Sequence, residues 1–142
     1  MSAEDFTPRI GRRIELASHP KFSVFADEVD VPGEPETRRY RVVAPRGGGP
    51  DLITGTCVLP VRDGRYALLC IYRHAIRAES WEIPRGFVDG ETAVVAARRE
   101  LEEKTGLTCA PSSLKPLGLV TPDAGVFAAR IQLFAALDCR DT

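Results

Sequence analysis

The chain is poor in the residues on which several kinds of site depend. Its four cysteines are widely separated and include no C-x-x-C pair, so the usual ligand spacing of a zinc site is missing. Only two histidines are present, His19 and His74, and neither stands in a pattern typical of nucleophilic catalysis. Zinc chemistry and histidine-assisted nucleophiles are therefore not expected.

Signals for membranes and for nucleic acid are also missing. The N-terminus, MSAEDFTPRI, carries acidic residues and no apolar run, and no stretch of the chain approaches membrane-spanning length. The formal net charge of −1 provides no basic field that would attract a nucleic acid polymer. We expect a cytoplasmic protein that binds neither membranes nor nucleic acid polymers, and in which disulfides are absent.

What the chain has is enough apolar material for a core, arranged mostly in short β-like runs. It is 142 residues long, 44% hydrophobic and 27% charged, as in ordinary globular proteins. Turn residues separate six predicted strands: 22–31, 40–44, 52–61, 66–72, 114–121 and 127–137. One clear amphipathic helix is predicted, with Thr92 as its N-cap and Gly106 as a left-handed C-terminal residue.

That helix lies in the stretch GFVDGETAVVAARRELEEKTGL, residues 86–107, and concentrates acidic side chains. Glu100 and Glu103 fall on neighbouring rows of the helix. The adjacent apolar stripe is predicted to hold Ala93, Val94, Ala97 and Leu101. Carboxylates in this arrangement suit Mg²⁺ or Mn²⁺, ions that are usually completed by water and substrate phosphates. Spacing alone leaves an alternative open, a solvated helix with ion pairs Arg98–Glu102 and Arg99–Glu103.

The order of residues in this stretch resembles the Nudix box, G-x5-E-x7-R-E-U-x-E-E-x-G-U, where U is a bulky aliphatic residue. The matching positions are Glu91, Arg99, Glu100, Leu101, Glu103, Gly106 and Leu107. The resemblance implies a Nudix fold: an α/β domain with a mixed β-sheet in an α/β/α sandwich. It also implies attack by water on a pyrophosphate phosphorus, with two or three divalent ions neutralising charge.

The resemblance further implies roles for particular residues. Glu100 and Glu103 would be metal ligands, and the main-chain carbonyl of Arg85 would be a third. Arg99 would orient the acidic face with Glu91 as its partner, and Glu100 could also serve as the base. The catalytic group is therefore expected to be Glu100, Arg99 and Glu103, with Mg²⁺ or Mn²⁺ as cofactor.

Residues outside the box narrow the resemblance. The run CIYRHAIRAESWEIPRG is similar to the segment before the box in ADP-ribose and nucleoside-diphosphate-sugar pyrophosphatases of this family. Arg73 and Glu82 then become candidates for gripping a small-molecule nucleotide substrate, ADP-ribose or a nucleotide sugar. For Arg73 a surface salt bridge is an equally good interpretation.

The first 50 residues are similar to the N-terminal antiparallel sheet that mediates dimer formation in those enzymes, with strands such as VFADEVDV and YRVVAP. We therefore expect residues 1–50 to form a dimerisation segment and residues 51–142 a Nudix domain, in a homodimer. The alternative is a hairpin that folds back on its own domain.

Several features depart from the family pattern. Gly86 and Glu91 are separated by four residues instead of five, which could misplace the Arg85 carbonyl. Lys104 replaces the last glutamate of the box; its ammonium could reach the carboxylates and weaken a metal site, and the alternative is a stem that bends outward to water. Ala129 stands where many relatives have a further glutamate; Asp123 is the nearest substitute, although a turn-forming aspartate is ordinary there.

The sequence leaves alternatives open for one face of the sheet and for the function. The second long helix that normally follows the strand FAARIQLFAAL is not expected, so one sheet face would be exposed or covered by a partner subunit. The departures also leave an alternative function, a degenerate Nudix domain that binds a nucleotide without hydrolysing it. A nucleoside triphosphate pyrophosphatase is a third and less favoured interpretation.

Overall fold

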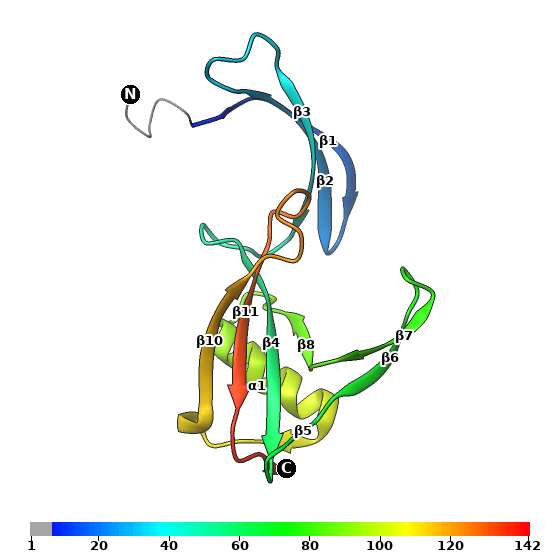
Figure 1. The fold of residues 1–142 in the computed structure, drawn as a ribbon, viewed down its shortest axis with the longest axis vertical. Helices are drawn as coiled ribbons and strands as arrows, with labels where there is room; N and C mark the ends of the chain where they lie inside the picture. The colour runs from blue at the N-terminus through cyan, green and yellow to red at the C-terminus, as the bar shows by residue number, and fades with distance from the viewer. Residues whose placement is uncertain (1–6) are drawn as a thin grey trace. The chain divides into compact units, whose positions relative to one another are not determined.

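The computed structural model describes residues 7–142, which divide into two compact units (Figure 1). Unit 1 contains the described residues up to Arg46 together with Pro122–Ala129. Unit 2 contains Gly47–Thr121 and Arg130–Thr142, and therefore the whole of the acidic helix. Each unit is described separately below.

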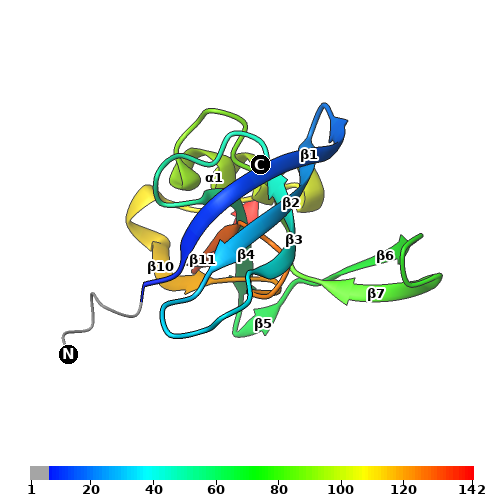
Figure 2. The ribbon, with the colours of Figure 1, turned by 90° about the horizontal axis from the view of Figure 1, so that it is seen from above.

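Unit 1 is a three-stranded antiparallel sheet in the order β1-β2-β3 (Figure 2). The strands are β1 (Arg9–His19), β2 (Phe22–Asp30) and β3 (Arg38–Pro45). The predicted strands 22–31 and 40–44 are confirmed, and so is the N-terminal antiparallel sheet. Strand β1 was not predicted from the sequence, because register shifts between Ile10 and Arg12 and between Glu15 and Ala17 interrupt its alternation.

A buried ion pair holds the first two strands of unit 1 together. Asp27 is only 3% exposed and accepts two hydrogen bonds from the Arg13 guanidinium, at 2.7 and 2.6 Å. Those bonds lower the pKa of Asp27 below its usual value. The same guanidinium lies 4.8 Å from the centre of the Phe25 ring, a cation–π distance. Arg13 therefore stabilises the sheet of unit 1 through its contacts with Asp27 and Phe25.

Unit 2 is built on a mixed sheet in the order β10-β11-β4-β5, with β8 pairing with β4 as well. Its strands are β4 (Ile53–Arg62), β5 (Arg65–Tyr66), β8 (Arg85–Phe87), β10 (Leu114–Val120) and β11 (Arg130–Ala136). Strands β11 and β4 are parallel and the other pairs are antiparallel, so the predicted mixed sheet is confirmed. Two small ladders complete the unit: β6 (Leu69–Arg73) with β7 (Ala78–Glu82), and β9 (Leu107–Thr108) with β12 (Arg140–Asp141).

Two predicted strands need correction. The run 66–72 is split at Ala67 and Leu68, because β5 pairs with β4 whereas β6 forms its own hairpin with β7. The run 127–137 begins only at Arg130. Its first residues belong to unit 1, where Phe127 forms an isolated bridge with Val43.

Helix α1 (Ala93–Thr105) packs against the sheet of unit 2, and a 3-10 turn (Pro111–Ser113) precedes β10. The predicted ends of α1 are confirmed: Thr92 accepts a hydrogen bond from the Val95 N–H, and Gly106 has φ 67°. Ala97 and Leu101 form the core with Val58, Phe134 and other buried residues of the sheet.

The buried face of α1 differs from the predicted stripe. Its buried residues are Ala96, Ala97, Glu100 and Leu101, whereas Val94 is 50% exposed. The buried face is thus centred between Glu100 and Leu101, so that a carboxylate is part of it. This shift brings Glu100 into the interior of unit 2.

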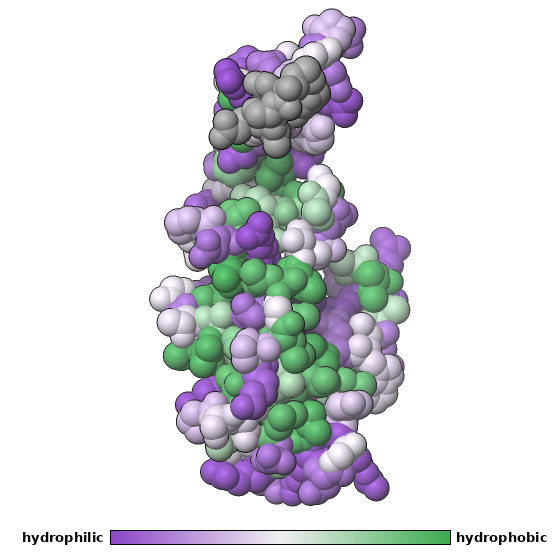
Figure 3. All heavy atoms as spheres, turned by 60° about the vertical axis from the view of Figure 1, so that its left-hand side comes forward, coloured by the Kyte–Doolittle hydropathy of each residue, from purple (hydrophilic) through white to green (hydrophobic). Residues whose placement is uncertain are grey.

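In the described part of the chain, α1 is the only α-helix beside the sheet of unit 2. Strand β10 is the edge of that sheet and exposes Leu117, Leu119 and Val120. Figure 3 shows hydrophobic residues gathered on the side of the unit where β10 lies. No helix within residues 7–142 is long and apolar enough to cross a membrane.

Candidate active site

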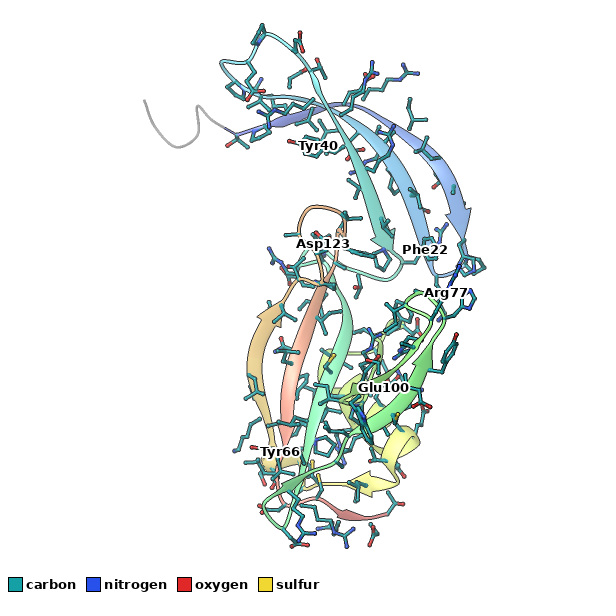
Figure 4. The ribbon with its side chains drawn as sticks, turned by 45° about the vertical axis from the view of Figure 1, so that its right-hand side comes forward. Phe22, Tyr40, Tyr66, Arg77, Glu100 and Asp123 are labelled. Atoms are coloured by element: carbon teal, nitrogen blue, oxygen red, sulfur yellow. The ribbon has the colours of Figure 1, made fainter. Side chains whose placement is uncertain are left out.

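Glu100 lies inside unit 2, with its carboxyl group pressed against the main chain of β8 (Figure 4). Only 5% of the residue is exposed. A Cβ atom placed on Gly86 would overlap that carboxyl group, so residue 86 must be glycine for the carboxylate to lie there. The first glycine of the box therefore makes room for Glu100.

One oxygen of this buried carboxylate has no partner. Oε1 of Glu100 accepts a hydrogen bond from Arg99 at 2.7 Å, whereas Oε2 is buried without a hydrogen bond among the described residues. Leaving a buried charged oxygen unsatisfied costs folding free energy. A hard divalent cation is the kind of ligand that would satisfy it. The orphaned Oε2 is thus the atom that fits a metal ion.

The carbonyl of Arg85 is left unused by the pairing of β8 with β4. Two hydrogen bonds that flank it join β4 to the segment around β8, namely Val58 N–H to Pro84 O at 2.9 Å and Val88 N–H to Thr54 O at 3.2 Å. In an antiparallel ladder the residues between such bonds direct their main-chain groups away from the partner strand. The Arg85 carbonyl is therefore not used by β4, and it precedes Gly86, on which Glu100 packs.

Arg99 connects the acidic residues of the box. Its guanidinium contacts Glu91 at 2.7 Å, Glu100 at 2.7 Å and Glu103 at 3.3 Å, and donates to the Phe87 carbonyl at 3.0 Å. The hydrogen bond with Glu91, followed by that with Glu100, raises the pKa of Arg99. The loop between Gly86 and Glu91 is one residue shorter than in the family pattern, but it still brings Glu91 to Arg99. It includes Asp89 and Gly90, both with positive φ.

Glu103 is the second acidic residue of the acidic corner, the name used here for Glu100, Glu103 and the Arg85 carbonyl. Its side chain is 56% exposed and shares one Arg99 nitrogen with Glu100, so the two carboxylates lie close together. Within residues 7–142, no group of three or more His, Cys, Asp or Glu side chains could hold a metal. The available donors are two carboxylates and a carbonyl, which suits Mg²⁺ because that ion keeps several waters.

Lys104 does not make the contact expected from the helical spacing. It forms no ion pair with any described residue, Glu100 included, and instead lines a cavity beside Tyr66 and Leu69. Of the two possibilities left open by the sequence, the lysine stem therefore turns away from the carboxylates. Lys104 replaces the last glutamate of the box without forming an ion pair with Glu100.

The two predicted substrate-binding residues bind each other. Glu82 accepts hydrogen bonds from Arg73 at 2.8 and 2.6 Å and from Arg85 at 2.9 Å. The bonds from Arg73, helped by Arg85, lower the pKa of Glu82 to about 2 although burial opposes the shift. The contacts of Arg73 match the salt-bridge alternative and lie within the β6–β7 hairpin, whereas the contact of Arg85 with Glu82 joins that hairpin to β8.

Asp123 and Ala129 belong to the loop of unit 1. Asp123 accepts a hydrogen bond from the Gly125 N–H at 2.8 Å, and its own carbonyl accepts from Phe127, so the side chain closes a turn. Ala129 is buried. The ordinary turn-forming role of Asp123 is thus the one its contacts display.

Sequence reasoning missed two features of the site. The packing of Glu100 on Gly86 depends on tertiary contact, and the only signal was that a glycine opens the box. The Phe87 carbonyl, which orients Arg99, is a main-chain atom and leaves no trace in the sequence.

Comparisons with known proteins identify the family and the fold of this chain. A model of the NUDIX domain matches residues 51–139. The CMP-5'-(N-acetyl-N-hydroxy-3-aminopropyl)phosphonate hydrolase of Streptomyces rubellomurinus is 30% identical over 131 residues, which are 89% of this chain and 58% of that protein. This chain thus spans less than two thirds of the curated relative. The crystal structure of an ADP compounds hydrolase shares the fold, with a TM-score of 0.78 and 21% identity over 94% of this chain and 69% of that one.

Proposed function

Because this chain belongs to the Nudix family, we propose that it hydrolyses the phosphoric anhydride bond of a nucleoside diphosphate derivative with the help of a divalent cation. The observation that carries the proposal is the buried Glu100 carboxylate, whose Oε2 lacks a partner where Gly86 makes room for it. ADP-ribose and nucleotide sugars are the leading substrates. The names of the relatives support a nucleotide, since one is named for a CMP derivative and the other for ADP compounds.

In this proposal each residue of the corner has a distinct task. Glu100 and Glu103, with the Arg85 carbonyl, hold Mg²⁺ or Mn²⁺. When bound, the cation neutralises charge on the anhydride oxygens. Arg99 holds the two carboxylates in place through its contacts at 2.7 and 3.3 Å. Glu82 has both oxygens occupied by arginines, so its task is to anchor the hairpin beside the site.

The degenerate nucleotide binder receives less support. It rests on the lost ligand at Lys104 and on Ala129, but Lys104 makes no ion pair with Glu100. The Oε2 atom of Glu100 therefore remains available to hold a cation.

We also propose that the protein is a homodimer through unit 1. Strand β1 is an edge of its sheet and exposes Ile10, Ile14 and Leu16, which is apolar surface that a partner would bury. Sedimentation at micromolar concentration should give a dimer; a stable monomer would contradict this part of the proposal.

The test of the function is mass-spectrometric detection of cleavage products from ADP-ribose and nucleotide sugars, with Mg²⁺ and with Mn²⁺. Glu100→Gln should lose more than tenfold in rate, because the neutral amide cannot hold the cation; tenfold corresponds to about 1.4 kcal/mol of transition-state stabilisation. Glu102→Gln is the matched control, since Glu102 is exposed on the same helix. Equal rates for Glu100→Gln and the wild type would remove Glu100 from the mechanism.

A further inference from the structure

A cavity of about 870 Å³ lies in unit 2 beside the last turn of α1, away from the acidic corner. The residues that matter for its chemistry are Arg62, Arg65, Tyr66, Leu69, Lys104 and Asp141. Neither Glu100 nor Glu103 lines it. Figure 4 shows Tyr66 well separated from Glu100, toward the end of unit 2 where β4 finishes.

A tight turn brings two arginines to this cavity. Asp63 and Gly64 both have positive φ, as in the two-residue turns that favour Asp-Gly, and they set Arg62 directly opposite Arg65 across the β4–β5 ladder. Like charges that face each other across two strands are destabilising unless anions compensate them.

Among the described residues, acidic side chains compensate only one of the two arginines. Arg62 donates to Asp141 at 2.6 and 3.1 Å and lies 3.8 Å from Asp63, so it uses both acidic residues that line the cavity. Arg65 and Lys104 make no ion pair with any residue between 7 and 142. The positive charges of Arg65, on β5, and Lys104, on α1, therefore line the same cavity.

Unpaired lysines at a helix C-terminus are common, because the helix dipole favours cations there. That explanation covers Lys104 but not Arg65, which is on a strand turn opposite another arginine. The observation that points to an anion is that both cations line one cavity.

We propose that this cavity is a second binding site, specific for the phosphate groups of a small molecule, with Arg65 and Lys104 as the residues that hold them. A guanidinium and an ammonium suit phosphate oxygens, and the volume is that of an ordinary small-molecule site. Tyr66, whose ring is largely exposed at the rim, offers a face for the base of a nucleotide. The site needs neither Glu100 nor a metal ion, so it stands apart from the proposed hydrolysis.

The proposal is tested by calorimetric titration of pyrophosphate and of ADP into the intact protein in the presence of EDTA. Both probes should bind, and Lys104→Gln and Arg65→Gln should each weaken binding at least tenfold, because a charge-assisted hydrogen bond is lost. Lys115→Gln, an exposed lysine on β10 that does not line the cavity, is the matched control and should bind as the wild type does.

A further variant separates this site from the acidic corner. Glu100→Gln should leave metal-free binding unchanged. Tighter binding of ADP than of pyrophosphate, lost in Tyr66→Ala, would extend the site to nucleotides. The proposal is overturned if the wild type binds neither probe, if Lys104→Gln and Arg65→Gln bind them normally, or if Glu100→Gln abolishes binding. None of these results depends on whether the protein hydrolyses anything.

Discussion

Glu82 and Glu100 are both mostly buried in unit 2 and bound by arginine, and they differ in how completely their oxygens are satisfied. Glu82, with 16% of its side chain exposed, accepts three hydrogen bonds from two arginines. Glu100, with 7% exposed, accepts one from Arg99 on Oε1 and none on Oε2. A fully satisfied buried carboxylate holds structure together, whereas a half-satisfied one indicates a ligand that completes it. The difference separates Glu82, whose oxygens are satisfied by arginines, from Glu100, for which we propose a metal ion, although both are candidate site residues in the sequence.

The largest effect should come from filling the space that Gly86 leaves. In Gly86→Ala the new methyl group overlaps the Glu100 carboxyl and must displace it. We expect a rate loss of more than a hundredfold, about 2.7 kcal/mol, and a stability loss of about 1–3 kcal/mol from overpacking. Cleavage assays and thermal unfolding measure the two. Gly49→Ala is the control, because a Cβ at Gly49 meets nothing within 4 Å, and normal activity in Gly86→Ala would break the comparison.

Glu82→Gln should damage stability rather than chemistry. The amide cannot accept the arginine bonds in the same way, so the free energy of unfolding should fall by about 1–3 kcal/mol in denaturant titrations. The rate at saturating substrate should change less than threefold. If Glu82→Gln instead lost activity as Glu100→Gln does while keeping its stability, Glu82 would contact substrate.

The same residue gives a smaller, pH-dependent effect. The pKa of Glu82 is lowered from 4.5 to about 2 by its bonds with Arg73 and Arg85. Its contribution to stability is therefore complete above about pH 4.5 and is lost as the pH falls toward 2. Unfolding free energies measured across that range should decrease more steeply in the wild type than in Glu82→Gln. Parallel curves would show that the ion pair contributes no stability.

The smallest effect is expected at Lys104. Lys104→Glu restores a box carboxylate, but on a side chain that lines the cavity beside Tyr66 and Leu69, so Mn²⁺ should bind only slightly more tightly. The gain should be only severalfold, because Lys104 makes no ion pair with Glu100 in the first place. Calorimetry with Mn²⁺ measures it, and a gain of a hundredfold would mean that the lysine reaches the site after all.

The sequence predicted the parts of this fold that depend on local pattern. The ends of α1 followed from Thr92 and Gly106, whose capping chemistry is local, and strands β2, β3, β4 and β10 followed from apolar runs between turns, whereas the short strand β8 was not predicted. Strand β1 was missed because its bulges break the alternation, and the split of the run 66–72 depends on which strand each half meets.

The contacts of the candidate site can also be divided into those that the sequence predicted and those that it did not. The order of acidic residues in the box predicted that Glu91 and Arg99 would pair, and they do. Spacing did not predict the direction of the Lys104 side chain or the contacts of Glu82 with two arginines. Each depends on how separate elements pack, since Lys104 lines a cavity with Tyr66 and Glu82 meets Arg73 across the β6–β7 hairpin. Helical geometry gives the row on which a side chain lies, but not which neighbour it chooses.

The most direct test of the account is a calorimetric titration of Mn²⁺ into the wild type, Glu100→Gln and Glu82→Gln. We expect the wild type to bind Mn²⁺ measurably. Glu82→Gln should bind Mn²⁺ with an affinity within threefold of the wild type, and Glu100→Gln should not bind it. The same affinity for Mn²⁺ in Glu100→Gln and in the wild type would contradict the claim that the unpartnered oxygen of Glu100 exists to hold a metal ion.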